Sequence, residues 1–223
     1  MTKTLFIKAI ALFSLGVLLL AALIFLPAGT LAYPAGWRLM AILFVPMFFA
    51  GLVMMVKNPA LLEKRLRAKE KQAEQKDVIR LSGLMFVAGF ATAGLDFRFG
   101  FSLLPDWVSY AACAAFLLGY VLYAEVLREN MWLSRTIEVQ AGQKVVSTGL
   151  YGVVRHPMYA ATLLLFLSMP LVLASGAAFV IFLAYPAIIV KRIRGEEALL
   201  ARELEGYSEY MQKVKYRLIP FVW

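Results

Sequence analysis

Histidine and cysteine are almost absent from this chain, which has one of each, His156 and Cys113, among its 223 residues. A single cysteine forms no disulfide within the chain, and one histidine with one cysteine in an apolar run does not make a conventional zinc site. Phosphate loops and nucleophile elbows are missing too, and Gly142, Gly149 and Gly152 do not fit the dinucleotide-binding spacing. The sequence therefore gives no support to these common metal, hydrolase and nucleotide-binding classes.

Charge is also scarce. Charged residues make up 17% of the chain and hydrophobic residues 62%, with a mean hydropathy of +0.75. Soluble domains carry closer to about 25% charged residues, so this chain has more apolar surface than one aqueous core can bury. The composition predicts an all-α, polytopic integral membrane bundle.

Long apolar runs divide the chain. A helix needs about 20 residues to cross a bilayer core, and the run 81–95 reaches that length only by continuing past Asp96 and Arg98 toward Leu104. The last two runs are short and are separated only by Ser175-Gly176, which is typical of a helical hairpin, with a partly re-entrant pair as the alternative. We expect six spans, or five as the fallback, from the runs 5–26, 37–56, 81–95, 107–127, 158–174 and 177–190.

The first run has a competing interpretation as a cleaved signal peptide. Lys3 and Lys8 stand at its start, and Thr30-Leu31-Ala32 is a weak cleavage site. Its apolar stretch of 22 residues exceeds the usual ~7–15 of a signal core. A retained membrane helix is the favoured interpretation.

Lysine and arginine are distributed very unevenly. If the runs alternate in direction, 21 of the 23 lie on one side, leaving Arg38 and Arg98 on the other. This positive-inside pattern predicts that both termini are cytoplasmic, and it accounts for the net charge of +9 without nucleic-acid binding. The charged segment 57–80 is expected to be a connector at the membrane surface, in reach of anionic lipid headgroups.

The first polar constellation surrounds His156, in the segment Gly149-Leu150-Tyr151-Gly152-Val153-Val154-Arg155-His156-Pro157-Met158-Tyr159. Pro157 suits the first turn of a helix, which puts His156 just outside the helix N-terminus, where free N–H groups attract anions. A histidine that only holds an interfacial turn is the alternative.

The second constellation follows the last run. Arg192 and Glu196 are four residues apart, so they share a face of a continuous helix. An ordinary interfacial ion pair beside snorkelling Lys191 and Arg194 is the alternative, although acids at a membrane boundary are costly unless solvated or liganded. Beyond them, an apolar stripe predicts an amphipathic helix packed on the bundle or the bilayer; it contains Leu200, Leu204, Tyr207, Met211 and Val214.

Taken in order, these motifs resemble the isoprenylcysteine carboxyl methyltransferase family and its bacterial relatives, a group that includes phospholipid N-methyltransferases. The resemblance covers roughly residues 128–223, and the earlier spans match only as generic membrane helices. Its elements are Thr148-Gly149-Leu150-Tyr151, Arg155-His156-Pro157-Met158-Tyr159, a hairpin, Arg192 with Glu196-Glu197, Tyr207-Ser208-Glu209-Tyr210 and the ending Arg217–Trp223.

The apolar runs predict membrane helices over 1–127 with the connector 57–80, and the resemblance implies a methyltransferase core over 128–223 with the hairpin 157–190 and a cytoplasmic C-terminal helix. It implies an enzyme of the bacterial cytoplasmic membrane that uses S-adenosylmethionine, releases S-adenosylhomocysteine and acts on a lipid-like or prenylated acceptor. Arg192, Glu196 and Arg155 would be catalytic, and Tyr159, Glu197, Tyr207 and Tyr210 are secondary candidates. The implied cofactor-binding residues are Gln143, Lys144, Val145, Val146, Tyr151, His156 and Glu196.

The residues fit either a carboxylate or an amine as the methyl acceptor. A carboxylate is ionised at neutral pH and needs no general base, whereas an amine must lose a proton, for which His156 or Glu197 is available. Carboxyl methylation is the favoured reading and phospholipid N-methylation the alternative. A non-catalytic scaffold or transporter is the alternative of another class; transporters place ionisable groups near the bilayer midplane, and only Glu125 approaches that position.

Overall fold

The computed structural model describes residues 3–57, 59–66, 73–133 and 138–223, and within these ranges every regular element is a helix. The expected all-α fold is confirmed. The helices are α1 (Lys3–Ala28), α2 (Pro34–Lys57), α3 (Pro59–Leu66), α4 (Ala73–Phe99), α5 (Asp106–Glu129), the 3-10 turn η1 (Gly149–Gly152), α6 (Pro157–Val172), α7 (Gly176–Phe182), α8 (Ala184–Glu203) and α9 (Tyr207–Lys213).

Five stretches in the described ranges are long and apolar enough to cross a membrane: Leu5–Ala28, Pro34–Lys57, Lys76–Phe99, Asp106–Glu129 and Gly176–Glu203. The remaining apolar helix, α6, has 16 residues, which at 1.5 Å per residue falls short of a bilayer core of about 30 Å. The expected six spans thus resolve into five long helices and one shorter one. The third run does continue past Asp96 and Arg98, to the end of α4 at Phe99.

The predicted break in the last hairpin is confirmed. α6 ends at Val172, Ala174 has a positive φ of 57°, and the Ser175 hydroxyl accepts a hydrogen bond from the Ala178 N–H at the start of α7. A serine side chain in this position satisfies one of the free N–H groups of a helix N-terminus. The chain then returns through α7 and α8.

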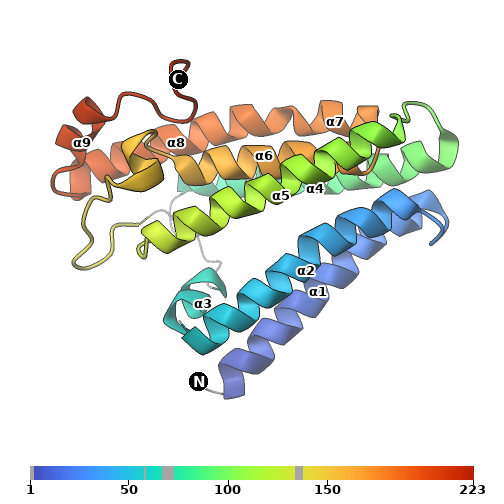
Figure 1. Ribbon diagram of the computed structural model, residues 1–223, viewed down its shortest axis with the longest axis horizontal. Coiled ribbons are helices and arrows are strands. Elements are labelled where there is room, and N and C mark those ends of the chain that lie inside the picture. The colour runs from blue at the N-terminus through green and yellow to red at the C-terminus, as the bar shows by residue number, and fades with distance from the viewer. Residues whose placement is uncertain (1–2, 58, 67–72, 134–137) are drawn as a thin grey trace.

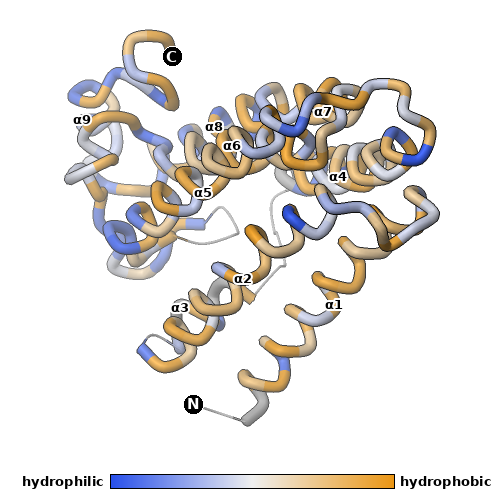
Figure 2. Tube along the Cα trace, turned by 45° about the vertical axis from the view of Figure 1, so that its right-hand side comes forward, coloured by the Kyte–Doolittle hydropathy of each residue, from blue (hydrophilic) through white to orange (hydrophobic). Residues whose placement is uncertain are grey.

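Helices α4 to α8 run side by side, and α1 and α2 form an antiparallel pair that converges on them at one end (Figure 1). That end, which we call the distal end, holds the tight turns at residues 29–33, 100–105 and 173–175. The opposite end, the connector end, holds α3, α9 and residues 130–133 and 138–156 (Figure 1). Hydrophobic residues cover α1 and α2 almost throughout, whereas hydrophilic ones concentrate around α9 and in the turns (Figure 2).

A buried acid ties the distal end together. Asp96, which is fully buried, accepts hydrogen bonds from the Ser102 N–H at 2.7 Å, the Ser175 hydroxyl at 2.5 Å and the Ser102 hydroxyl. Buried carboxylates are tolerated when such donors surround them. This explains how α4 carries an acid within a membrane-spanning length, and it links the end of α4 to the start of α7.

Candidate functional site

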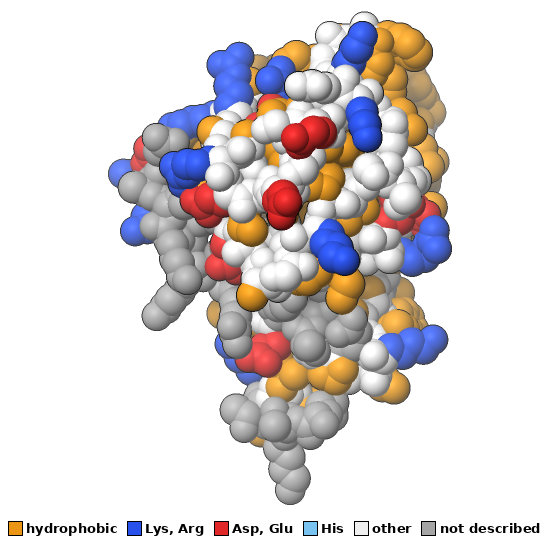
Figure 3. All heavy atoms as spheres, turned by 90° about the vertical axis from the view of Figure 1, so that its left-hand side faces the viewer, with side chains coloured by type: hydrophobic (Ala, Val, Ile, Leu, Met, Phe, Trp, Pro, Cys, Tyr) orange, Lys and Arg blue, Asp and Glu red, His pale blue; other side chains and the backbone are white. Residues whose placement is uncertain are grey.

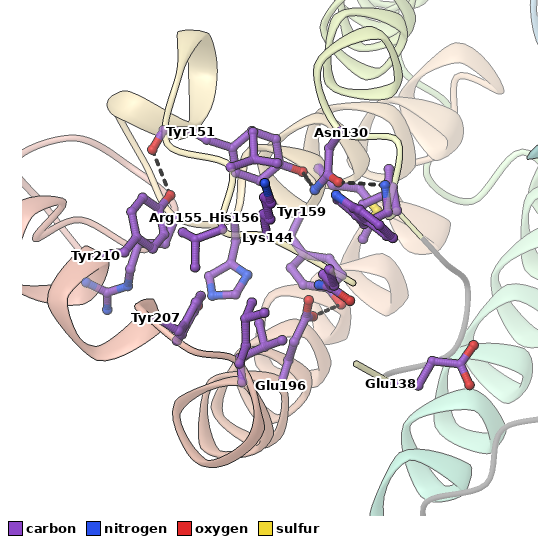
Figure 4. Close-up of a pocket in the computed structure, with 18 of the residues that line it drawn as sticks. Asn130, Glu138, Lys144, Tyr151, Arg155, His156, Tyr159, Glu196, Tyr207 and Tyr210 are labelled. Atoms are coloured by element: carbon purple, nitrogen blue, oxygen red, sulfur yellow. Dashed lines mark hydrogen bonds between the residues drawn. The ribbon is translucent and has the colours of Figure 1, made fainter. Parts of the chain in front are cut away.

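A pocket opens at the connector end, between residues 130–133 and 138–159 on one side and helices α8 and α9 on the other (Figure 4). Seen from that end, acidic and basic side chains are interspersed over the surface, with apolar side chains along its edges (Figure 3). Every residue that the sequence nominated as a cofactor ligand lines the pocket, as do Arg155, Arg192, Tyr159, Tyr207 and Tyr210. Segments that are far apart in sequence therefore meet here as expected, while the roles of the individual residues stay predictions.

Several lining residues had no motif to indicate them. The C-terminal end of α5 contributes Asn130 and the residues after it, and Leu200 and Leu204 face the pocket although their periodicity indicated only packing. Glu138 lies at its outer edge (Figure 4). The residues missed by sequence reasoning are Asn130, Trp132, Leu133, Glu138, Met158, Leu200 and Leu204.

The motif Thr148-Gly149-Leu150-Tyr151 opens η1, with Thr148 as its N-cap residue, and its glycine is required by the backbone conformation. Gly149 has a φ of +52°, and a side chain there would collide with the Glu129 carboxylate. That carboxylate accepts a hydrogen bond from the Leu150 N–H at 3.0 Å. The close approach fastens η1 to the end of α5 and sets the position of Tyr151.

Tyr151 then connects three parts of the site. Its hydroxyl accepts a hydrogen bond from the Asn130 amide at 2.9 Å, and its carbonyl accepts one from the Tyr210 hydroxyl at 2.7 Å (Figure 4). The end of α5, η1 and α9 are thereby held at fixed separations on the same side of the pocket.

Glu197 lies behind the pocket, where it binds three basic groups. Its Oε1 accepts a hydrogen bond from Arg155 Nε at 2.7 Å and lies 3.2 Å from His156 Nε2, and its Oε2 accepts one from Arg217 Nε at 2.7 Å. Arg155, His156 and Glu197 are all buried. A buried carboxylate with this many partners acts as a structural centre, which joins the start of α6, α8 and the C-terminal segment.

The backbone reinforces that centre. Arg155 Nη1 donates to the carbonyls of Val214 and Lys215 at 2.7 and 3.0 Å, and the His156 N–H donates to the Arg217 carbonyl at 2.9 Å. His156 is the N-cap residue of α6, with Pro157 in the first turn, as the sequence predicted. The extended segment after α9 is thus bound to the residues that precede α6.

Arg192 and Glu196 both face the pocket, and Tyr159 lies between them. Arg192 Nε donates to the Tyr159 hydroxyl at 2.9 Å, and that hydroxyl donates to Glu196 Oε2 at 2.5 Å. The shared helix face predicted from their spacing is confirmed. The tyrosine hydroxyl connects the guanidinium to the carboxylate, which fixes the orientation of both side chains.

The C-terminal stripe differs from the single helix expected over residues 200–214. α8 ends at Glu203, Gly206 has a φ of +80°, and α9 begins at Tyr207. The stripe nevertheless packs as one cluster, and it covers the loop that carries Val145 rather than an open face. The buried residues of this cluster are Leu204, Tyr207, Tyr210 and Val214, and the partly buried Val139, Val145, Leu200 and Met211 pack against them.

Tyr207 is unusual within this cluster. Burial raises the pKa of its phenol, and the negative charges of Glu197 and Glu196 raise that pKa further, so the hydroxyl stays protonated at physiological pH. Within the part of the chain that the structure describes, this buried hydroxyl has no hydrogen-bond partner.

This chain is similar to known methyltransferases in both sequence and fold. Residues 107–205 match the family model described as phospholipid methyltransferase. The fold matches the solved structure of the eukaryotic intramembrane Ras methyltransferase ICMT, an isoprenylcysteine carboxyl methyltransferase, with a TM-score of 0.59 and 19% sequence identity, over 96% of this chain and 77% of that one. The predicted family resemblance is confirmed.

Curated relatives share shorter segments. The Delta(14)-sterol reductase TM7SF2 of Mus musculus is 33% identical over 91 residues, which is 40% of this chain and 22% of the relative. The Delta(14)-sterol reductase of Methylotuvimicrobium alcaliphilum is 25% identical over 135 residues, 54% of this chain and 32% of the relative. The nickel-cobalt-cadmium resistance protein NccN of Alcaligenes xylosoxydans xylosoxydans is 30% identical over 112 residues, 48% of this chain and 49% of the relative. The chain spans less than half the length of each.

Proposed function

We propose that this chain is an integral membrane methyltransferase that transfers the methyl group of S-adenosylmethionine to a lipid-borne acceptor, and that the acceptor is a carboxylate of the isoprenylcysteine type. The observation that carries the proposal is the pocket, in which the residues nominated from the family motifs converge at one end of a membrane bundle. Most of its lining also lies within the segment that matches the phospholipid methyltransferase family.

The lining suits a cofactor with a flat apolar part and polar ends. One wall is the cluster that contains Leu204 and Tyr207, and another is a cluster of Leu133 and Tyr151 with Val146 against them. Pockets that combine apolar walls with a few fixed polar groups are typical of small-molecule sites. S-adenosylmethionine would supply an electrophilic methyl group there; Glu196 would bind hydroxyl or amino groups, and Lys144 at the exposed rim would attract carboxylate.

Arg192 is the residue proposed to hold the acceptor. A guanidinium can grip a carboxylate through two parallel hydrogen bonds, and the contact with Tyr159 orients its Nε edge. Because a carboxylate is already ionised at pH 7, the chain must mainly align acceptor and methyl group, which positioning alone accelerates.

The contacts of Glu197 support the choice of a carboxylate over an amine. An amine acceptor needs a base to remove its proton, and Glu197 is buried and bound to Arg155, His156 and Arg217. A carboxylate so neutralised is a poor base, and the Nε2 of His156, the other candidate base, is occupied by that same carboxylate at 3.2 Å. Phospholipid N-methylation remains the second candidate, because the matching family model carries that name.

The connector end is proposed to face the cytoplasm of a bacterial cell, with both termini on that side. A water-soluble cofactor would then reach the pocket directly, while the lipid-borne acceptor arrives from the bilayer. Cytoplasmic lysine and arginine excess is the usual determinant of such orientation.

Binding of S-adenosylmethionine by the purified protein in detergent, measured by isothermal titration, tests the proposal. Glu196→Gln should weaken binding by about tenfold or more, since it removes a charge-assisted contact. Glu203→Gln, at an exposed acid beside Arg202, should leave binding unchanged. No binding by the wild-type chain, or equal binding by Glu196→Gln, contradicts the proposal.

Two further arms identify the reaction. Membranes incubated with the methyl-labelled cofactor should yield a base-labile ester; label that stays in a lipid headgroup would indicate N-methylation instead. Because two relatives are named as sterol reductases, and such chemistry takes hydride from a reduced nicotinamide cofactor, NADPH is titrated in parallel. A protein that binds NADPH but does not bind S-adenosylmethionine would be a reductase, and the proposed methyltransferase function would be rejected.

A further inference from the structure

The buried Tyr207 hydroxyl has no use in the fold itself. The residue is 4% exposed and lines the pocket, and no described residue offers its hydroxyl a hydrogen bond. Other buried tyrosines are satisfied: the hydroxyl of Tyr33 donates to the Leu173 carbonyl at 2.6 Å, and that of Tyr210 donates to the Tyr151 carbonyl at 2.7 Å. Because a buried polar group without a partner destabilises a protein, the exception at the pocket calls for a partner from outside the chain.

We propose that the Tyr207 hydroxyl binds the ligand directly, and that its partner is a sugar hydroxyl of the cofactor's nucleoside. This inference rests on the proposed function and extends it, because it assigns a recognition role to α9. Tyr207 lies at the start of that helix and points toward the part of the pocket that holds His156 (Figure 4).

The surroundings of Tyr207 select the chemistry of the partner. Its ring belongs to the apolar cluster with Leu204 and Val145, which suits the flat base of a nucleoside. Its oxygen feels the negative charge of Glu197 and Glu196 more strongly than the positive charge of Arg155, so an anionic group such as a carboxylate or phosphate is disfavoured beside it. A neutral polar group next to an apolar ring is the chemistry that remains.

A hydroxyl also matches the available donors and acceptors. A hydroxyl group donates one hydrogen bond and accepts up to two, so it can accept from Tyr207 while donating to Glu196. Tyr159 uses only part of the capacity of the Glu196 carboxylate, which can accept about four hydrogen bonds. One ligand hydroxyl thus bridges α8 and α9 across the pocket.

Tyr207→Phe and Tyr210→Phe form a matched pair, since they remove the same atom three residues apart. For each variant and the wild type, affinity is measured for S-adenosylhomocysteine and for its 2′-deoxy and 3′-deoxy analogues, and thermal stability is measured without ligand. Tyr207→Phe should lose roughly 3- to 10-fold in affinity for S-adenosylhomocysteine, the value of one hydrogen bond. It should keep or raise the stability of the free protein. Tyr210→Phe should lower stability, because it strands the Tyr151 carbonyl.

The analogues locate the contact. One of the two deoxy analogues should bind the wild type more weakly than S-adenosylhomocysteine, and should bind Tyr207→Phe and the wild type equally. A Tyr207→Phe variant that unfolds or is less stable has lost a partner within the chain, and this outcome overturns the inference. Equal affinity for S-adenosylhomocysteine, or a loss that persists with both analogues, overturns it as well. Absence of binding by the wild type is a separate result, which rejects the proposed function itself.

Discussion

At the scale of single residues, Glu197 is the acid that joins several basic groups beside the pocket. Its carboxylate is bound by Arg155, His156 and Arg217, and the Arg155 pair is buried on both sides, with 6% and 8% of the side chains exposed. Removing one partner of a buried pair leaves the other charge uncompensated, whereas breaking an exposed pair costs little. Helix α8 contains both kinds of pair: Glu197 forms the buried one, and Glu203 forms an exposed one with Arg202.

We therefore expect Glu197→Gln to lower the free energy of unfolding by about 3–5 kcal/mol, although glutamine keeps the shape of the side chain. Glu203→Gln should lower it by less than about 1 kcal/mol. Denaturant unfolding in detergent micelles measures both. Similar losses in the two variants would mean that the buried cluster does not hold α6 and α8 together.

Substitutions at Gly149 and Gly142 distinguish the cost of a left-handed backbone from the cost of a steric clash. Both have a positive φ, +52° and +73°, but a side chain at Gly149 meets the Glu129 carboxylate and one at Gly142 meets nothing. Gly142→Ala should cost about 1–2 kcal/mol of stability for the left-handed backbone alone. Gly149→Ala should cost more, because the displaced Glu129 carboxylate also loses its hydrogen bond from the Leu150 N–H, and it should weaken cofactor binding, because that bond holds η1 and Tyr151 to α5. Unfolding and titration of both variants check this, and equal effects would contradict it.

The sequence predicted the site residues that lie in motifs, including Glu197 and Tyr159 as secondary candidates, but it did not predict their distant contacts, and it did not nominate Asn130. His156 before Pro157, and Arg192 four residues before Glu196, are local patterns. The Glu197 cluster joins residues 20 to 42 positions apart, and the position of Tyr159 between Arg192 and Glu196 depends on how α6 packs on α8. Asn130 enters the site only because α5 ends beside η1. Such contacts follow from the fold and have no local pattern.

At the scale of elements, the distal end depends on Asp96. Asp96→Ala should lower the free energy of unfolding by at least about 2 kcal/mol, because the hydroxyls of Ser102 and Ser175 and the Ser102 N–H lose their acceptor. Affinity for S-adenosylmethionine should not change in the fraction that stays folded, since the pocket lies at the other end of the bundle. Asp106→Ala, at an acid that is 83% exposed beside Arg38, is the control and should cost under about 1 kcal/mol.

Unfolding curves and binding isotherms of the same preparations decide this prediction. A loss of cofactor affinity in Asp96→Ala would show that the two ends are coupled, contrary to the view of Asp96 as a structural tie. The same residue shows why element ends were harder to predict than elements. An acid in a hydrophobic run suggests that a helix stops there, and only the three donors around Asp96 explain why α4 continues to Phe99.

The end of α8 shows the opposite error. The apolar periodicity from Leu200 to Val214 is continuous, so the sequence predicts one helix, yet the chain turns at Gly206. The stripe packs against the loop around Val145 and needs no bilayer to cover it. Periodicity identified the buried face correctly, but it could not distinguish one helix from two short helices that bury the same residues in one cluster.

At the scale of the whole molecule, the two ends of the bundle differ in charge, and the candidate pocket lies at the connector end. Among the described residues, the distal end carries Arg38 and Arg98, while the connector end carries Lys144, Arg155 and Arg192 together with the pocket. A bundle that orients by its basic residues would therefore present the pocket to the cytoplasm, where the proposed cofactor is made. The distribution of lysine and arginine would then set both the orientation of the bundle and the side of the membrane from which the pocket is reached.

Cysteine labelling tests that orientation directly, because Cys113 is the only native thiol and Cys113→Ala removes it. On that background, Leu31→Cys places a thiol in an exposed turn of the distal end, and Ala141→Cys places one in an exposed turn beside the pocket. A membrane-impermeant maleimide added to intact cells should label Leu31→Cys and leave Ala141→Cys unlabelled until the membrane is permeabilised. The Cys113→Ala parent reports background. The reverse pattern would place the pocket outside the cell, where no S-adenosylmethionine is made, and would rule out the proposed reaction.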